Sequence, residues 1–457
     1  LVGSEMCIRD RETQLPEDIE KAKWCGDFAR AGRLIAQRLQ NPKTPAFLRE
    51  RLALEQEILL RLPLDYCYSE PEALRLIRKD IPDFTEDELL SLEDSGAVDW
   101  IYREGKPYLS RRFYETLLKV HPDISRRAGI KEADTVSEKQ LLSNTLAWMK
   151  EKGSDSWHIR LKASLAIDDQ AFRPGELLKV HLPLPKEAEN MRNVKLLACS
   201  PEAFHISAPD APQRTAYFEC TPDKNIPFTV EYEYDACVTY TMPDAAQVSS
   251  AQPNFCTEEQ SPHIVFTPTI RKLCTELSGG ETNPLLLARQ FYKYCTEAVT
   301  YSYMREYFTI LQIPEYAALN QKGDCGVQAM LFITLCRCAG IKERWQSGLF
   351  VTPYSQGCHD WAQFYIAPYG WLFADPSFGG SGYRSGNFEK QEHYFGNLDP
   401  FRMVANSEFQ KAFDPPKMQL RSDPYDNQKG EAEYDGHGLL WNELEASWEL
   451  LEMRRNP

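Results

Sequence analysis

A cysteine at the predicted start of a buried helix is the first feature of this sequence that could do chemistry. Cys325 follows Gly323 and Asp324, and aspartate is a residue type that caps helix N-termini. Residues 326–339 are apolar on nearly all sides, which predicts a buried helix that Gly340 ends. The free amide protons and the dipole of a helix N-terminus stabilise a thiolate. We therefore expect Cys325 to have a lowered pKa and to act as a nucleophile.

A histidine and an aspartate follow at positions from which they could serve this nucleophile. Residues 358–366 and 371–375 predict two strands of a hairpin, joined by a turn that contains proline and glycine. His359 begins the first strand and Asp375 ends the second, so both lie at the open end of the hairpin. A helix packed on the sheet edge would bring Cys325 to the same place. The three side chains would then supply a nucleophile, a general base and a carboxylate that orients the base.

The motifs around these residues resemble those of the transglutaminase-like superfamily. They are Gly-Asp-Cys at a helix start, His-x-Trp at the opening of a strand, and Gly-Trp-x-x-x-Asp-Pro, and the match covers about residues 264–403. The resemblance implies a papain-like α+β fold in which Cys325 is the nucleophile, His359 the general base and acid, and Asp375 the third member. Members of the superfamily crosslink glutamine to amines, hydrolyse amides or peptides, or have lost activity. The motifs do not indicate whether this protein crosslinks, hydrolyses or has lost activity.

The leading hypothesis is a cysteine-dependent enzyme that acts on amide bonds of a peptide or protein substrate and needs no cofactor. The thiolate of Cys325 would attack an amide carbonyl to give a thioester, and His359 would protonate the departing amine. Asp375 would hold the orientation of the imidazole. We favour hydrolysis slightly over glutamine–amine crosslinking. The neighbouring carboxylate Asp360 faces the other way on a strand, so Asp375 is the better third member.

The alternative hypothesis is a non-catalytic peptide-binding or assembly scaffold that retains the fold. The large helical N-terminal region favours this alternative, because a minimal hydrolase has no need of it. The intact nucleophile, base and acid residues count against it, because a scaffold needs none of them.

We expect no metal site. Cys336 and Cys338 are two residues apart on a helix and point about 200° apart, so they cannot bind one ion together. The run 423–430 lacks the spacing of a calcium loop, and we expect it to be a solvated loop.

Hydrophobic periodicity predicts a multi-domain α+β protein. It has a helical N-terminal region, an antiparallel β-sandwich and then a papain-like α+β core. Apolar residues recur with helical spacing before about residue 146, and the period changes to two between 157 and 240. The expected parts are 1–11, a translated sequencing-adapter artefact; 12–150, a helical domain; 151–245, an Ig-like β-sandwich; 246–262, a linker; and 263–457, the transglutaminase-like catalytic domain with a C-terminal extension.

Composition limits the class of partner. The 457 residues carry 52 Lys and Arg against 67 Asp and Glu, a net charge of −15, without a dense basic stripe. We therefore expect no binding to nucleic acid or to an anionic membrane surface. The longest apolar run, 329–336, is far below the ~18 residues that span a bilayer, so we expect a soluble protein. The scattered cysteines favour reduced thiols and a cytoplasmic location. The sequence leaves the oligomeric state open.

Overall fold

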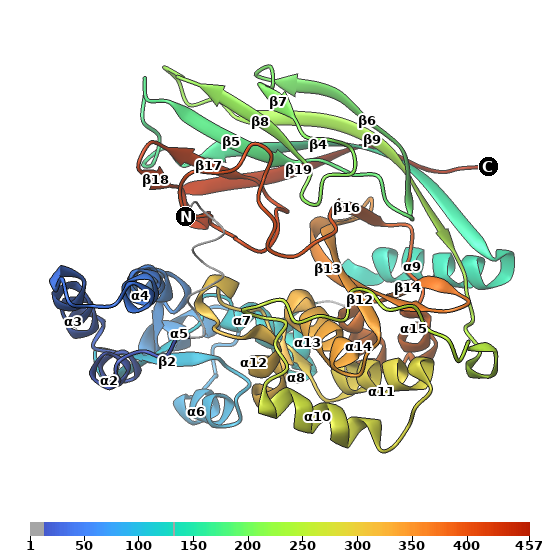
Figure 1. Ribbon diagram of the computed structural model, residues 1–457, viewed down its shortest axis with the longest axis horizontal. Helices are drawn as coiled ribbons and strands as arrows, with labels where there is room; N and C mark the ends of the chain where they lie inside the picture. Colours follow the sequence, from blue (N-terminus) through green and yellow to red (C-terminus); the bar gives the residue numbers. More distant parts are fainter. Residues whose placement is uncertain (1–12, 131–132) are drawn as a thin grey trace.

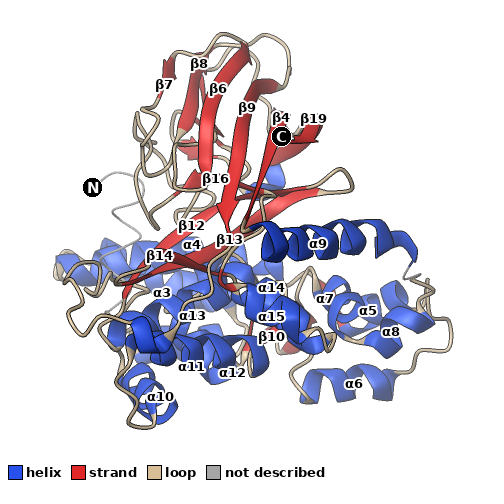
Figure 2. Cartoon of the chain, turned by 90° about the vertical axis from the view of Figure 1, so that its right-hand side faces the viewer, coloured by secondary structure: helices blue, strands red, loops and turns tan. Residues whose placement is uncertain are grey.

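The computed structural model describes residues 13–130 and 133–457 of the chain (Figure 1). The expected adapter segment 1–11 lies outside the described residues. The chain forms an N-terminal helical region, a region of two packed sheets, and a core in which helices cover a third large sheet. Figure 2 shows this core sheet between the two packed sheets and the helical layer. The mixed helix-and-sheet class expected from the sequence is confirmed.

Side-chain caps open some of the helices of the N-terminal region. The backbone N–H of Thr85 donates to the Glu88 carboxylate at 2.8 Å, and the Thr85 hydroxyl accepts from the N–H of Glu88, a capping box that opens α6. Strands β2 and β3 form the hairpin at residues 100–109, and β1 pairs with β3. No helix within residues 13–130 or 133–457 has the length and apolar character needed to cross a bilayer. The elements are α2 (Glu17–Trp24), α3 (Phe28–Gln40), α4 (Ala46–Asp65), β1 (Tyr68–Ser69), α5 (Glu70–Ile77), α6 (Glu86–Asp94), β2 (Trp100–Arg103), β3 (Lys106–Leu109), α7 (Phe113–Val120), α8 (Pro122–Arg127) and α9 (Ala133–Lys152).

Two antiparallel sheets pack face to face in residues 154–239 and 431–455, called here the two-sheet region. One sheet has the strand order β18–β17–β5–β8–β7, and the other β19–β4–β9–β6. Inward residues alternate along β4 and β9, and Phe218 contacts Phe228 of the other sheet with ring centroids 5.4 Å apart. The strands are β4 (Ser154–Ile167), β5 (Leu178–Pro183), β6 (Met191–Ser200), β7 (His205–Ile206), β8 (Thr215–Cys220), β9 (Phe228–Thr239), β17 (Glu431–Tyr434), β18 (His437–Gly438) and β19 (Leu444–Arg455).

The last strands join this region, although the expected boundaries placed them with the catalytic domain at 263–457. Strand β17 pairs with β5, and β19 pairs along most of β4. An alternating pattern can identify a strand but not its partner, so the pairing of β19 with β4 could not be predicted from the sequence. The core is therefore inserted between strands of the two-sheet region.

The core is a five-stranded sheet of order β15–β14–β13–β12–β16 covered by helices. Helix α13 is buried along most of its length, as its apolar sequence predicts, and Phe332 contacts Phe364 of β13 with centroids 5.9 Å apart. Gly340 follows the helix with a positive φ of 79°, a conformation that favours glycine. The elements are α10 (Pro268–Ser278), α11 (Pro284–Glu297), β10 (Thr300–Tyr301), α12 (Ile313–Asn320), β11 (Lys322–Gly323), α13 (Cys325–Cys338), β12 (Lys342–Val351), β13 (Gln356–Ile366), β14 (Gly370–Ala374), α14 (Pro376–Arg384), α15 (Phe388–His393), β15 (Phe395–Gly396) and β16 (Arg402–Asn406).

Polar contacts hold the N-terminal helical region against the core. The backbone N–H of Glu306 donates to Asp65 Oδ2 at 2.7 Å, and that of Tyr303 donates to the Thr116 hydroxyl at 3.1 Å. Arg61 also contacts Glu306, with its Nη1 2.9 Å from the Glu306 carboxylate. The segment 303–306, which precedes the helix of Cys325, is thus positioned by the N-terminal region.

Candidate active site

The first turn of α13 fixes the position of Cys325. Asp324 is the N-cap, and its Oδ1 accepts from the backbone N–H of Val327 at 3.2 Å. The Tyr307 hydroxyl donates to the same oxygen. A Cβ at position 326 would lie 2.2 Å from the Tyr307 hydroxyl oxygen, so this approach requires Gly326. Cys325 itself is half-buried.

His359 of β13 and Asp375, which follows β14 and caps α14, form a buried pair. His359 Nε2 lies 2.7 Å from Asp375 Oδ2. Burial lowers the pKa of His359 despite the nearby Asp375, so the imidazole is neutral at pH 7. Burial by itself would raise the pKa of Asp375, but His359 and Arg402 outweigh it and hold that pKa below its usual range. A carboxylate only accepts hydrogen bonds, so Nε2 carries the proton and Nδ1 keeps a basic lone pair.

A buried arginine supports this pair from behind. Arg402 Nη2 lies 3.0 Å from Asp375 Oδ2 and 2.8 Å from Asp399 Oδ2, and all three side chains are fully buried. Asp399 also accepts a hydrogen bond of 2.7 Å from the Tyr394 hydroxyl. Asp375 in addition caps α14, because its Oδ1 accepts from the backbone N–H of Phe378 at 2.9 Å. Sequence analysis missed Arg402 and Asp399, because no motif marks them.

The thiol of Cys325 is bound to a carboxylate rather than to the imidazole. Cys325 Sγ donates to Asp360 Oδ2 over 3.3 Å. Burial and the carboxylates of Asp360 and Asp324 raise the pKa of Cys325 well above its ordinary value. The expectation of a lowered pKa is therefore wrong for this conformation. The helix N-terminus favours a thiolate, but the acidic neighbours and burial oppose it more strongly.

Because side chains alternate along β13, Cys325 lies on one side of this strand and the His359–Asp375 pair on the other. Asp360 points to the face of β13 on which Cys325 lies. His359 points to the opposite face, where its ring stacks on Trp361 and contacts Phe378, with ring centroids 6.1 and 4.8 Å away. Among the described residues, no hydrogen bond links the Cys325 thiol to His359. The structure thus brings His359 and Asp375 together, whereas Cys325, at the start of α13, contacts Asp360, the residue next to His359 on β13.

A segment near the C-terminus contributes to the surroundings of the thiol. Gln428 Nε2 donates to Asp360 Oδ1 at 2.7 Å and to the backbone carbonyl of His359 at 3.0 Å. The carboxyl groups of Asp360 and Asp426 are hydrogen-bonded, and burial together with Asp426 raises the pKa of Asp360 well above its usual range. The expectation of a solvated loop at 423–430 is wrong, because Tyr425, Asp426 and Asn427 are buried by packing on the core.

No cluster of three or more His, Cys, Asp or Glu side chains within residues 13–130 and 133–457 is arranged to hold a metal ion. The Cys325, Asp360 and Asp426 side chains are joined by hydrogen bonds instead.

Comparisons with known proteins were made for sequence and for structure. Residues 271–376, which contain Cys325, His359 and Asp375, match the family model of the transglutaminase-like superfamily. Among curated proteins, no sequence matches the chain significantly.

Several solved structures share a distant likeness. A candidate cysteine protease from Cytophaga hutchinsonii is 11% identical with a TM-score of 0.34, over 66% of this chain and 90% of that one. The periplasmic domain of TgpA from Pseudomonas aeruginosa is 12% identical with a TM-score of 0.27, over 54% of this chain and 96% of that one. A candidate protease from Parabacteroides distasonis is 8% identical with a TM-score of 0.21, over 50% of this chain and 60% of that one. The family match confirms, for residues 271–376, the resemblance to the transglutaminase-like superfamily that the three motifs indicated.

Proposed function

We propose that this protein is a cysteine-dependent enzyme that acts on amide bonds of peptides or proteins, with Cys325 as nucleophile, His359 as base and acid, and Asp375 as the residue that orients the imidazole. The observation that carries the proposal is the buried 2.7 Å contact between Asp375 and His359, whose strand β13 packs against the helix that Cys325 begins. This contact leaves the Nδ1 lone pair of His359 as the base. Arg402 also holds Asp375 in place, which keeps its carboxylate directed at His359.

Catalysis begins with a proton transfer from the Cys325 thiol to His359. The resulting thiolate attacks the amide carbonyl, and the tetrahedral intermediate collapses to a thioester as the imidazolium gives its proton to the departing amine. Water, deprotonated by the same imidazole, then cleaves the thioester to an acid and restores the thiol. Asp375 stabilises the imidazolium in both steps, and Arg402 holds Asp375.

The contact between Cys325 and Asp360 must open before this sequence can start. We take the described conformation as a resting form in which the thiol is neutral and protected. Gln428 and Asp426 must be displaced to release the half-buried thiol, and the start of α13 must then shift so that the sulfur reaches the face of β13 that carries His359. Substrate binding is the event that we expect to drive this change.

A non-catalytic peptide-binding or assembly scaffold is the second candidate. The observation that favours it is the 3.3 Å contact of the thiol with Asp360, because a neutral thiol without an imidazole partner is a poor nucleophile. In this alternative, the buried His359–Asp375 pair serves stability alone.

An acyl-trapping experiment distinguishes the two candidates. The full chain is incubated with a tryptic digest of denatured casein and hydroxylamine, and peptide hydroxamates are counted by mass spectrometry. Wild type and the control Cys358→Ser should form them, whereas Cys325→Ser and His359→Gln should not, because one lacks the nucleophile and the other the base. If wild type forms no more hydroxamate than Cys325→Ser, the enzymatic proposal fails and the scaffold is favoured.

Hydrolysis in preference to crosslinking is part of the same proposal. Adding dansylcadaverine to the reaction separates the two outcomes, because a crosslinking enzyme attaches the amine to glutamine side chains and a hydrolase releases acid. Incorporation of the amine at a rate above that of acid release would reverse the preference.

We also propose a cytoplasmic location. The twelve described cysteines are all free thiols, which suits a reducing compartment. Fractionation of cells that make the natural protein would test this, and recovery outside the cytoplasmic fraction would contradict it.

A further inference from the structure

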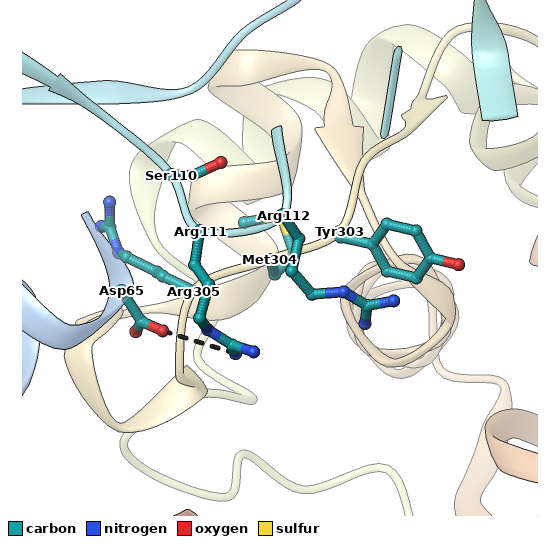
Figure 3. A pocket seen from close by; sticks show the side chains of 7 residues that line it. All are labelled: Asp65, Ser110, Arg111, Arg112, Tyr303, Met304 and Arg305. Carbon is teal, nitrogen blue, oxygen red and sulfur yellow. Dashed lines mark ion pairs between the residues drawn. The ribbon is translucent and has the colours of Figure 1, made fainter. Parts of the chain in front are cut away.

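The arginines where the N-terminal helical region meets the core are bound within the protein. Arg112 pairs with Glu115, and Arg305 Nη1 donates to the Tyr66 hydroxyl at 2.9 Å. Figure 3 shows Arg111 and Arg112 extending to one side of this junction, while Arg305 turns the other way. These side chains join the two regions. A group of side chains whose chemistry the proposed mechanism does not use lies elsewhere, among the cysteines of the core.

Four thiols gather where α10 and α11 pack against α13. Cys336 of α13 interacts electrostatically with Cys274 of α10 and with Cys295 of α11. Cys338, at the end of α13, hydrogen-bonds to Cys274. Cys336 hydrogen-bonds to the carboxyl group of Glu343, and Cys295 is fully buried. The two thiols in direct contact with each other are therefore those of Cys274 and Cys338.

The Cys274 thiol lies against the last turn of α13. Its Sγ is 3.8 Å from the backbone carbonyl oxygen of Leu335, which precedes Cys338 by about one helical turn. Both helices belong to one hydrophobic core, so the two sulfurs are held together by the fold. A disulfide requires two cysteines on adjacent backbone segments, and α10 and α13 provide such segments.

The two cysteines differ in exposure and in acidity. Cys338 is half-buried, whereas Cys274 is buried. The hydrogen bond with Cys274 and the positive charge of Arg271 lower the pKa of Cys338 to about 7, against burial and the carboxylate of Glu259. The same hydrogen bond and burial raise the pKa of Cys274. Oxidants react with the thiolate, so an oxidant meets Cys338 first, and Cys274 stays a thiol beside it.

From these contacts we infer that Cys338 and Cys274 form a peroxide-sensitive pair that closes to a disulfide between α13 and α10. Hydrogen peroxide is the oxidant. The Cys338 thiolate attacks one peroxide oxygen, the oxygen–oxygen bond breaks, and the products are a sulfenic acid at Cys338 and hydroxide. The Cys274 sulfur then attacks the sulfenic sulfur. The sulfur–sulfur bond forms, the sulfur–oxygen bond breaks, and the hydroxyl group leaves as water with the proton of Cys274.

In total, the two thiols lose two electrons and two protons, and one peroxide becomes two molecules of water. A dithiol reductant returns both thiols by exchange, so the bond is reversible. The disulfide would tie α10 to the end of the helix that Cys325 begins. Neither cysteine of the pair takes part in the chemistry proposed for Cys325, so the pair can be tested without a substrate.

Peptide mass spectrometry of the full chain tests this pair. The reduced protein is treated with hydrogen peroxide, free thiols are blocked with N-ethylmaleimide, and the protein is digested with trypsin without reduction. Trypsin cuts after Lys and Arg, so Cys274 lies in the peptide 273–289 and Cys338 in the peptide 338–342, which does not contain Cys336. We expect these two peptides to be linked, at their summed mass less two hydrogen atoms, and to be released by dithiothreitol. The linked species should form faster as the pH rises through about 7, because Cys338 then ionises.

Variants show the order of the two steps. Cys274→Ser should abolish the linked peptide and leave a sulfenic acid at Cys338, which dimedone traps, and Cys274→Ala gives the same readout if serine is not tolerated in the buried position. Cys338→Ser should give neither the linked peptide nor a dimedone adduct at Cys274. The control is Cys199→Ser, which changes a half-buried cysteine of the two-sheet region and should behave as wild type.

Absence of the linked peptide from oxidised wild type would overturn the inference. Its formation in the same yield from protein unfolded in urea before oxidation would also overturn it, because the fold would then not direct the pairing. A dimedone adduct confined to other cysteines in Cys274→Ser and Cys274→Ala would show that peroxide does not react at Cys338, with the same consequence.

Discussion

Replacing Asp360 by asparagine is the most direct test of how the resting thiol is controlled. The substitution keeps the size of the side chain and an oxygen that can accept the hydrogen bond from Gln428, which is 2.7 Å long in the structure. It removes a titratable carboxyl group beside Cys325. Burial and the Asp360 and Asp324 carboxylates raise the pKa of Cys325, so Asp360→Asn should lower it.

The distance between Cys325 Sγ and Asp360 Oδ2 sets the size of the change in the pKa of Cys325. Unit charges 3.3 Å apart interact by about 5 kcal/mol at an effective dielectric constant of about 20. The hydrogen bond to Asp426 and the raised pKa of Asp360 reduce the charge that Asp360 carries, so about 5 kcal/mol is an upper bound on the change. This bound is large against the value of about 1.4 kcal/mol for one pH unit, so the fall in the pKa of Cys325 should be measurable by titration.

The rate of alkylation by iodoacetamide at Cys325, followed by peptide mass spectrometry across pH, measures this pKa because the thiolate is the reacting form. The control is Asp435→Asn, which removes an exposed carboxylate of the two-sheet region. The midpoint should shift to lower pH in Asp360→Asn alone. An unchanged or higher midpoint would mean that Asp360 does not hold the thiol neutral, and the account of the resting form would have to be abandoned.

Three further predictions concern stability, each measured by urea or thermal unfolding. Arg402→Met should cost about 3–5 kcal/mol, because it leaves two buried carboxylates without their cation, and the exposed Arg454→Met should cost little; equal costs would show that the buried cluster is not ionised. Gly326→Ala should cost about 1–3 kcal/mol, because its methyl group would meet a tyrosine hydroxyl, whereas Gly357→Ala has open space and should be nearly neutral; a neutral result at both positions would refute the close packing. Burial raises the pKa of Glu93 to about 7, so its contribution is present below pH ~4.5 and is lost as the pH rises through 7. Glu93→Gln should therefore stabilise the protein at pH 8 relative to wild type and have little effect at pH 4, and a larger gain at pH 4 would contradict this sign.

Local sequence signals predicted the elements that carry the candidate site. The apolar stretch after Asp324 forms α13, and the alternating stretches around the Pro/Gly turn form β13 and β14. Period-two alternation also placed Asp360 and His359 on opposite faces, so the pairing of His359 with Asp375 could be anticipated. These features depend on residues close together in the chain, which is why they could be inferred.

The surroundings of the thiol could not be inferred in the same way. Asp426 and Gln428 reach the site from a segment without regular structure, and no periodicity indicates where such a segment packs. Arg402 is an arginine in a strand, and its burial between Asp375 and Asp399 depends on contacts that only the folded chain supplies. The pKa of a cysteine depends on such neighbours as much as on its helix, so its direction could not be derived from sequence.

Residues 407–430, called here the strap, connect the core to the two-sheet region. The strap leaves the core at β16 and enters the two-sheet region at β17 (Figure 1). Between these two strands, Gln428 donates a hydrogen bond to Asp360, which the Cys325 thiol contacts. The side-chain amide of Asn406 donates to the backbone carbonyl of Asn427 at 3.0 Å and accepts from its backbone N–H at 3.2 Å. These two hydrogen bonds hold the strap close to β16. The surroundings of the sulfur are therefore built jointly by the core and by a segment that the two-sheet region anchors, so a substitution that loosens β17 should change the accessibility of Cys325.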